Sequence, residues 1–97
     1  MLPKKQRLSP QSFVGRRPEQ TFSTTAFLVK AYVSGLDENR FAAIIGQAAE
    51  RSAVRRHALR RQMLECLGRW PKLRRDFLVV ALPKIRDFGK GEITAAL

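Results

Sequence analysis

The sequence predicts a single-domain α+β protein, an α/β sandwich in which a small mixed sheet packs against one long basic helix. The chain has 97 residues, of which 44% are hydrophobic, so it can bury one modest core but not two. A segment with helical periodicity separates segments of strand-forming composition. This order indicates a strand–helix–strand crossover beside antiparallel strands, and we expect residues 1–97 to form one domain.

The first 17 residues are predicted to form a basic arm that leads into a short helix. They carry five lysines and arginines and no acid. In "RLSPQSF", Ser9 is a candidate N-cap, and Pro10 suits the first helical position. A backbone N–H at that position has no partner within the helix, so proline loses no hydrogen bond there. The following "GRRPEQT" is expected to be a loop, because Gly15 and Pro18 interrupt regular structure.

Three apolar stretches are predicted to form the sheet. "FSTTAFLVKAYVS" (22–34) is rich in Phe, Thr, Val and Tyr, so we expect either two strands or one bent strand. "RFAAIIG" (40–46) follows the turn "GLDEN" and is expected to be another strand. "RDFLVVALP" (75–83) is almost continuously apolar, which is typical of a central strand buried on both faces. "IRDFGKGEITAAL" (85–97) is predicted to be a C-terminal helix weakened by its glycines.

The main helix is predicted over residues 52–70, with Ser52 as its N-cap and Pro71 just beyond its end. An apolar stripe at spacing i, i+4, i+7 and i+8 is expected to lie on the sheet: Leu59, Met63, Cys66 and Leu67. A different face of the helix groups three side chains at i, i+3 and i+4: His57, Arg60 and Arg61.

The net charge of +11 is concentrated in the N-terminal arm and in residues 51–75, where nine basic residues stand against one acid. Such an excess indicates a polyanionic partner, which is nucleic acid or, less often, an anionic membrane. Clustered positive charges on a helix repel one another, and a phosphate backbone removes this repulsion and releases counterions. A merely solvated basic face is the alternative, and the near absence of acids argues against it.

The sequence lacks the residues that several functional classes require. Cys66 is the only cysteine, so no internal disulfide can form, and without a recognisable signal peptide we expect a reducing cytoplasm. His57 is the only histidine, which leaves few ligands for zinc. No apolar run approaches the roughly 20 residues that span a bilayer. No acids with paired spacing and no glycine-rich phosphate loop are visible, so we expect no catalytic or metal site in the protein alone.

Two quoted stretches carry a resemblance to a known family. "MLPKKQRLSPQSF" resembles the N-terminus of the bacterial ribonuclease P protein subunit, where a basic arm precedes a Phe on a short helix. "RSAVRRHALRRQMLE" is similar to the RNR motif helix of that family, and it matches in register at Arg51, Ala53, Val54, Arg56, Arg60 and Arg61. The strands predicted on either side of this helix also stand where the family has them. The sequence departs from the family in lacking Ser-Lys-Lys, which is replaced by Gly46, Gln47 and Ala48, and in carrying His57 for the motif's Asn.

The resemblance implies a left-handed crossover and a cytoplasmic ribonucleoprotein that removes the 5′ leader from precursor tRNA. In this family a large RNA performs catalysis with metal ions, for which magnesium is expected, while the protein is not catalytic alone and holds no cofactor. It implies a protein monomer in a 1:1 complex with the RNA, and no membrane. The residues implied to bind the RNA subunit are Arg51, Arg55, Arg56, His57, Arg60 and Arg61. Those implied to line a cleft for the leader are Phe13, Phe27 and Lys30, with burial in the core as the alternative for both rings.

Other binding modules remain as alternatives. The first is another small basic RNA- or DNA-binding protein, of ribosomal type, with no part in cleavage. A helix-turn-helix DNA reader needs a second helix close by, whereas the segment after Pro71 is predicted to be a strand. A helix lying on a membrane surface would need a bulkier apolar face than "SAVRRHALRRQMLECL" provides.

Overall fold

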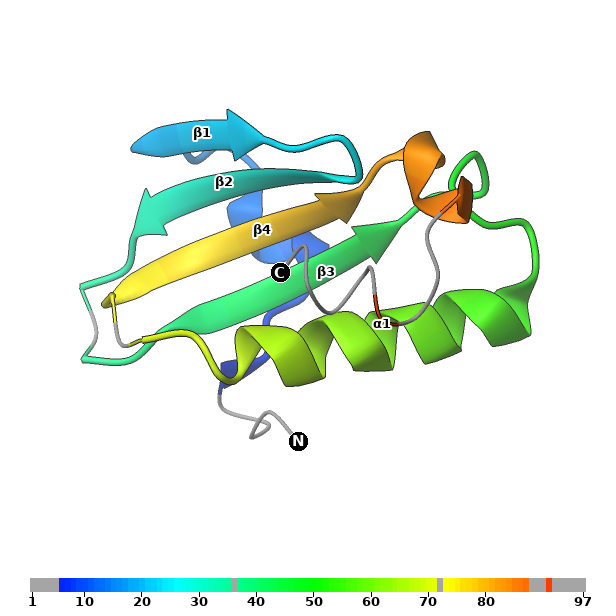
Figure 1. Ribbon diagram of the computed structural model, residues 1–97. Coiled ribbons are helices and arrows are strands. Elements are labelled where there is room, and N and C mark those ends of the chain that lie inside the picture. Colours follow the sequence, from blue (N-terminus) through cyan, green and yellow to red (C-terminus); the bar gives the residue numbers. More distant parts are fainter. Residues whose placement is uncertain (1–5, 36, 72, 88–90, 92–97) are drawn as a thin grey trace.

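The computed structural model describes residues 6–35, 37–71, 73–87 and 91 of the chain. One four-stranded sheet carries a single long helix on one of its sides (Figure 1). In chain order, the elements are η2 (Pro10–Phe13), β1 (Gln20–Ser23), β2 (Phe27–Val33), β3 (Arg40–Ile45), α1 (Ala53–Leu67), β4 (Arg75–Ala81) and η3 (Pro83–Asp87). The elements η2 and η3 are short 3₁₀ helices.

The strand order in the sheet is β1-β2-β4-β3. The pairs β1–β2 and β2–β4 are antiparallel, whereas β3 and β4 are parallel and are joined through α1. The predicted mixed sheet and its crossover are therefore confirmed, and β4 is the central strand that its apolar sequence indicated. In Figure 1, α1 lies in front of the sheet, β3 and β4 run to the right, and β4 lies above β3. This arrangement makes the crossover left-handed.

Alternation along β4 divides the core between the two faces of the sheet. Phe77 and Val79 face α1, and they belong to the larger core cluster together with Met63 and Leu67 of the helix. Leu78 faces the other way and packs against a smaller cluster on the η2 side, which comprises Phe13, Tyr32 and Ala42 with Leu8 beside them. Because both faces of β4 are covered, its sequence has no polar alternation.

The segment predicted as one bent strand or two is a hairpin of two strands, β1 and β2. The turn between them is closed by Thr24, whose N–H donates to the Phe27 carbonyl at 2.7 Å and whose hydroxyl accepts from the Phe27 N–H at 3.1 Å. The main helix ends at Leu67, three residues earlier than predicted, with Gly68 as its C-cap. Of the helix predicted over 85–97, η3 reaches Asp87, and the rest apart from Gly91 lies outside the described residues.

A buried asparagine fixes the connection from α1 to β4. The Asn39 side chain is 5% exposed, donates to the Pro71 carbonyl at 2.9 Å, and accepts from the N–H groups of Leu73 at 2.8 Å and Arg75 at 3.4 Å. Between these two donors, Arg74 adopts a positive φ of 57°, which is unfavourable for a side chain larger than glycine. The three bonds to Asn39 hold the backbone on both sides of this residue and so maintain its conformation.

Candidate nucleic-acid interface

The start of α1 is fixed by four local hydrogen bonds. The Ser52 hydroxyl accepts from the Arg55 N–H at 3.3 Å, as expected of an N-cap, and the Ser52 N–H donates to the Glu50 carboxylate at 3.1 Å. Arg56 folds back, and its Nη1 donates to the carbonyls of Glu50 at 3.0 Å and Arg51 at 2.9 Å. Arg56 is therefore half-buried and holds the loop before the helix. The motif match did not reveal this role.

The predicted apolar stripe is the face of α1 that packs on the sheet. Met63, Cys66 and Leu67 are buried, and Leu59 is partly buried against the same core cluster. The helical spacing of these residues was enough to identify this face, because the pattern repeats with the turn of the helix.

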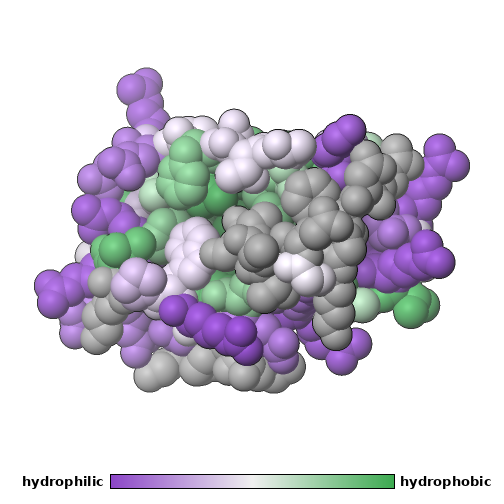
Figure 2. Space-filling model, in the orientation of Figure 1, coloured by the Kyte–Doolittle hydropathy of each residue, from purple (hydrophilic) through white to green (hydrophobic). Residues whose placement is uncertain are grey.

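The outward side of α1 carries positive charge that no acid of the described chain neutralises. Its exposed basic side chains are Arg55, His57, Arg60 and Arg61, and Arg51 lies just before the N-cap. None of these five makes an ion pair within the described residues. Glu65 is the only acid on the helix, and it is exposed as well. Hydrophilic side chains surround the rim of the face that carries α1, whereas hydrophobic ones gather over the sheet (Figure 2).

Four arginines elsewhere in the fold are paired with acids. Asp76 is fully buried and binds Arg40 through two bonds of 2.8 Å and Arg16 through one of 3.0 Å. The hydrogen bonds that Arg40 donates to Asp76 raise the pKa of the Arg40 guanidinium above its usual value, although partial burial lowers it. At the sheet margin, Arg75 binds Glu19 at 2.6 Å. Asp76 and Glu19 thus bind arginines of the sheet and its loops, whereas the exposed arginines of α1 have no acid partner among the described residues.

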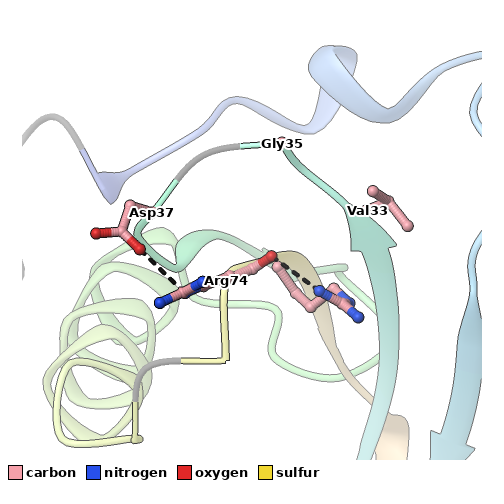
Figure 3. A pocket seen from close by; sticks show the side chains of 5 residues that line it. Val33, Gly35, Asp37 and Arg74 are labelled. Carbon is pink, nitrogen blue, oxygen red and sulfur yellow. Dashed lines mark hydrogen bonds and ion pairs between the residues drawn. The ribbon is translucent and has the colours of Figure 1, made fainter.

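A further arginine–acid pair lines a shallow hollow at the end of β2 (Figure 3). There Arg74 Nε lies 3.0 Å from Asp37 Oδ1, and both side chains point away from the core. Val33 and Gly35 form the other wall. Because the Asp37 carboxylate neutralises Arg74, this hollow is a poorer site for an anion than the outer side of α1.

The sheet face opposite α1 brings together two of the three residues predicted for a leader cleft. Phe13 packs on Tyr32 with ring centroids 4.8 Å apart, and both rings are buried. Lys30 is half-buried and pairs in register with Leu78, which lies against the same aromatic cluster. The structure does not bring Phe27 to this surface, because it is 1% exposed within the core under α1.

The separation of Phe27 from Lys30 has a simple cause that was readable in the sequence. The two residues are three positions apart on one strand, and an odd spacing puts side chains on opposite faces of a sheet. The other unanticipated residue is Asp76, whose carboxylate holds Arg16 across 60 positions of sequence. A lone acid at the start of an apolar strand signals a buried charge, but it does not identify the partner.

Two further features bear on the functional class. None of the described helices combines the length and the apolar composition needed to cross a bilayer. Among the residues that the structure describes, no three His, Cys, Asp or Glu side chains are grouped in a way that could hold a metal ion.

Comparison with known proteins gives a family match in sequence and several matches in structure. The model of the Ribonuclease P family matches residues 2–97. No curated protein matches the chain in sequence. A mutant RNase P protein from Staphylococcus aureus, described as defective in mRNA degradation activity, is 17% identical with a TM-score of 0.79, over 95% of this chain and 81% of that one. The RNase P protein from Thermotoga maritima is 20% identical with a TM-score of 0.69, over 78% of this chain and 74% of that one.

Proposed function

The chain belongs to the Ribonuclease P family as a protein subunit of the bacterial enzyme, and from that premise we propose that it uses two separate surfaces in tRNA processing. The outer side of α1 binds the catalytic RNA. The sheet face opposite α1 receives the single-stranded 5′ leader of precursor tRNA. The protein acts in the cytoplasm as a monomer, in a 1:1 complex with the RNA.

The observation that carries the first assignment is the distribution of paired and unpaired arginines. Arg16 and Arg40 bind Asp76, whereas Arg60 and Arg61 on α1 are exposed and bind no acid of the described chain. Unpaired charges side by side on a rigid helix repel one another, and a nearby phosphate backbone converts that repulsion into attraction and counterion release. The N-cap at Ser52 and the folded-back Arg56 keep the helix start fixed, so the charged side is presented in one orientation.

The second assignment is supported by the chemistry of the opposite sheet face. Single-stranded nucleic acids are held by positively charged surfaces that combine with aromatic or guanidinium planes. Lys30 and Arg16 supply charge there, and Phe13 and Tyr32 lie directly beneath Arg16. This face lies across the sheet from α1, so one protein can contact both RNAs at once.

We assign the chemistry of leader removal to the RNA, with magnesium as the expected metal ion. Two of the described acids bind arginines of the fold: Asp76 binds Arg16 and Arg40, and Glu19 binds Arg75. The resemblance to the family supports the same division between a catalytic RNA and a binding protein.

The assignment of α1 is tested by titrating the catalytic RNA with a double variant and a charge-matched control. Arg60→Ala with Arg61→Ala removes two unpaired charges. Arg74→Ala with Arg75→Ala removes the same formal charge from positions that are paired with Asp37 and Glu19. We expect the first variant to bind the RNA much more weakly and the control to stay close to wild type, with circular dichroism confirming that both fold. Equal losses in the two variants would show that only total charge matters, and the α1 interface would be refuted.

A further inference from the structure

The aromatic pair on the sheet face opposite α1 is closed to a nucleic-acid base. Phe13 is 5% exposed and Tyr32 is 4% exposed. The guanidinium of Arg16 lies over both rings, with its Cζ 5.3 Å from the Phe13 centroid and 5.1 Å from the Tyr32 centroid. A base could reach either ring only by displacing this arginine.

Arg16 is held firmly in place, which makes it unfavourable for a base to displace it and reach the two rings. Its Nη1 donates to the buried carboxylate of Asp76 at 3.0 Å, and its Nη2 donates to the Val33 carbonyl at 2.9 Å. Asp76 is in turn fixed by the two bonds from Arg40. A guanidinium anchored at two nitrogens and packed on two rings has lost most of its rotational freedom before any ligand arrives.

The part of Arg16 that remains open suits a base. The side chain is still 29% exposed. Its Cζ lies over both rings and its two terminal nitrogens are hydrogen-bonded, so we infer that the side turned away from the rings is the one open to a ligand. Guanidinium planes stack on unpaired RNA bases, and their charge attracts the neighbouring phosphates.

We propose that Arg16 is a preformed stacking platform for one unpaired base of single-stranded RNA, and that Asp76 is the positioning residue that holds it in place. This inference rests on the proposed function, because the RNA in question is the leader of precursor tRNA. The aromatic pair supports the platform from beneath and does not touch the base. Lys30, on the same sheet face, supplies additional positive charge near the strand.

The neighbouring Arg17 provides a matched control. It is exposed, lies in the same loop, carries the same charge and has no partner within the described chain. Arg16→Lys keeps the positive charge of Arg16 but removes its planar guanidinium group. A platform requires that Arg16→Ala and Arg16→Lys both weaken binding of leader-bearing precursor and that Arg17→Ala weakens it far less.

The experiment uses the reconstituted holoenzyme and a series of precursor tRNAs, each with one abasic nucleotide at a different leader position. With wild-type protein, we expect one abasic position to lower affinity by roughly 5- to 150-fold, the range for losing one stacked base. Holoenzyme made with Arg16→Ala should lose a similar factor with intact leader and should be indifferent to the same abasic position. Mature tRNA, which has no leader, should bind all forms equally.

Each other outcome counts against a specific claim. If wild-type holoenzyme binds intact precursor more tightly than mature tRNA but no abasic position matters, the platform is refuted while leader binding stands. If Arg16→Lys binds like wild type, Arg16 is only a charge and the platform is refuted. If wild-type protein gives no preference for a leader at all, the proposed function of this face fails. If Arg16→Ala does not fold, the abasic series repeated with Arg16→Lys, which keeps the charge, decides whether the sensitive base stacks on Arg16.

Discussion

Replacing Asp76 with asparagine should remove a large part of the stability of the fold. Asp76 is 0% exposed and accepts three hydrogen bonds from two guanidinium groups, at 2.8, 2.8 and 3.0 Å. Asparagine keeps one acceptor oxygen, but it turns an NH₂ group toward arginine donors and removes the negative charge. Breaking a buried ion pair on one side costs about 3–5 kcal/mol, because the remaining charge is left without its partner.

The exposure of the two arginines places the expected loss at the lower end of that range. Arg16 and Arg40 are 29% and 26% exposed, so each can recover some hydration once Asp76 is gone. We therefore expect Asp76→Asn to lower the free energy of unfolding by about 3 kcal/mol. For a domain of this size, such a loss lowers the melting temperature by roughly 12–24 °C.

Urea denaturation followed by circular dichroism and by the fluorescence of Trp70 measures this loss. Trp70 is the only tryptophan and packs edge-on against Phe41 and Phe77 in the larger core cluster, so its signal reports the α1 side of the sheet. The matched control is Asp37→Asn, which breaks an ion pair of the same length whose side chains are 67% and 71% exposed. That variant should change stability far less. Similar losses in both variants would show that burial does not strengthen the Asp76 network, and the reasoning would be refuted.

Four other outcomes follow from the structure. RNA binding should weaken by roughly two to three decades between 50 mM and 200 mM salt if about five phosphates are neutralised, and a flat titration would contradict a phosphate interface. Phe13→Ala should destabilise the fold by about 3–5 kcal/mol, since the ring is 5% exposed, and an unchanged urea midpoint would contradict this packing role. Purified protein should not cleave precursor tRNA, and activity that survives nuclease treatment and repurification would overturn the assignment of catalysis to RNA. The raised pKa of Arg40 means that its stabilising effect is complete below the unfolded-state pKa and is lost only as the pH rises through the folded-state pKa. The stability difference between wild type and Arg40→Met should therefore stay constant over about pH 6–9, which urea titrations at several pH values can check.

The sequence was sufficient to predict the elements that are marked by a local pattern of residues. Leu59, Met63, Cys66 and Leu67 follow the turn of a helix, and residues 75–81 form an apolar run that suits only a covered strand. Neither pattern depends on what lies elsewhere in the chain. The fold class, the position of the basic helix and the direction of its apolar side were therefore available from the amino-acid sequence alone.

The direction in which individual charged side chains point was not available in the same way. Arg56 matches the same motif as Arg60 and Arg61, yet it folds back on the carbonyls before the helix while the other two are exposed. All three are arginines on one helix, so composition cannot separate them. Arg56 differs because the loop that enters α1 passes within reach of its guanidinium.

Contacts between distant segments were decided by the tertiary structure. Arg16, Arg40 and Asp76 meet because β4 lies beside β3 and because η2 packs on the sheet face that Asp76 shares. Only the register of the strands determines that the carboxylate faces these arginines, since a shift of one residue would turn it toward α1. The sequence thus determined which residues are charged and which segments are apolar, and the packing of the sheet decided which charges neutralise each other and which remain exposed without an acid partner in the described chain.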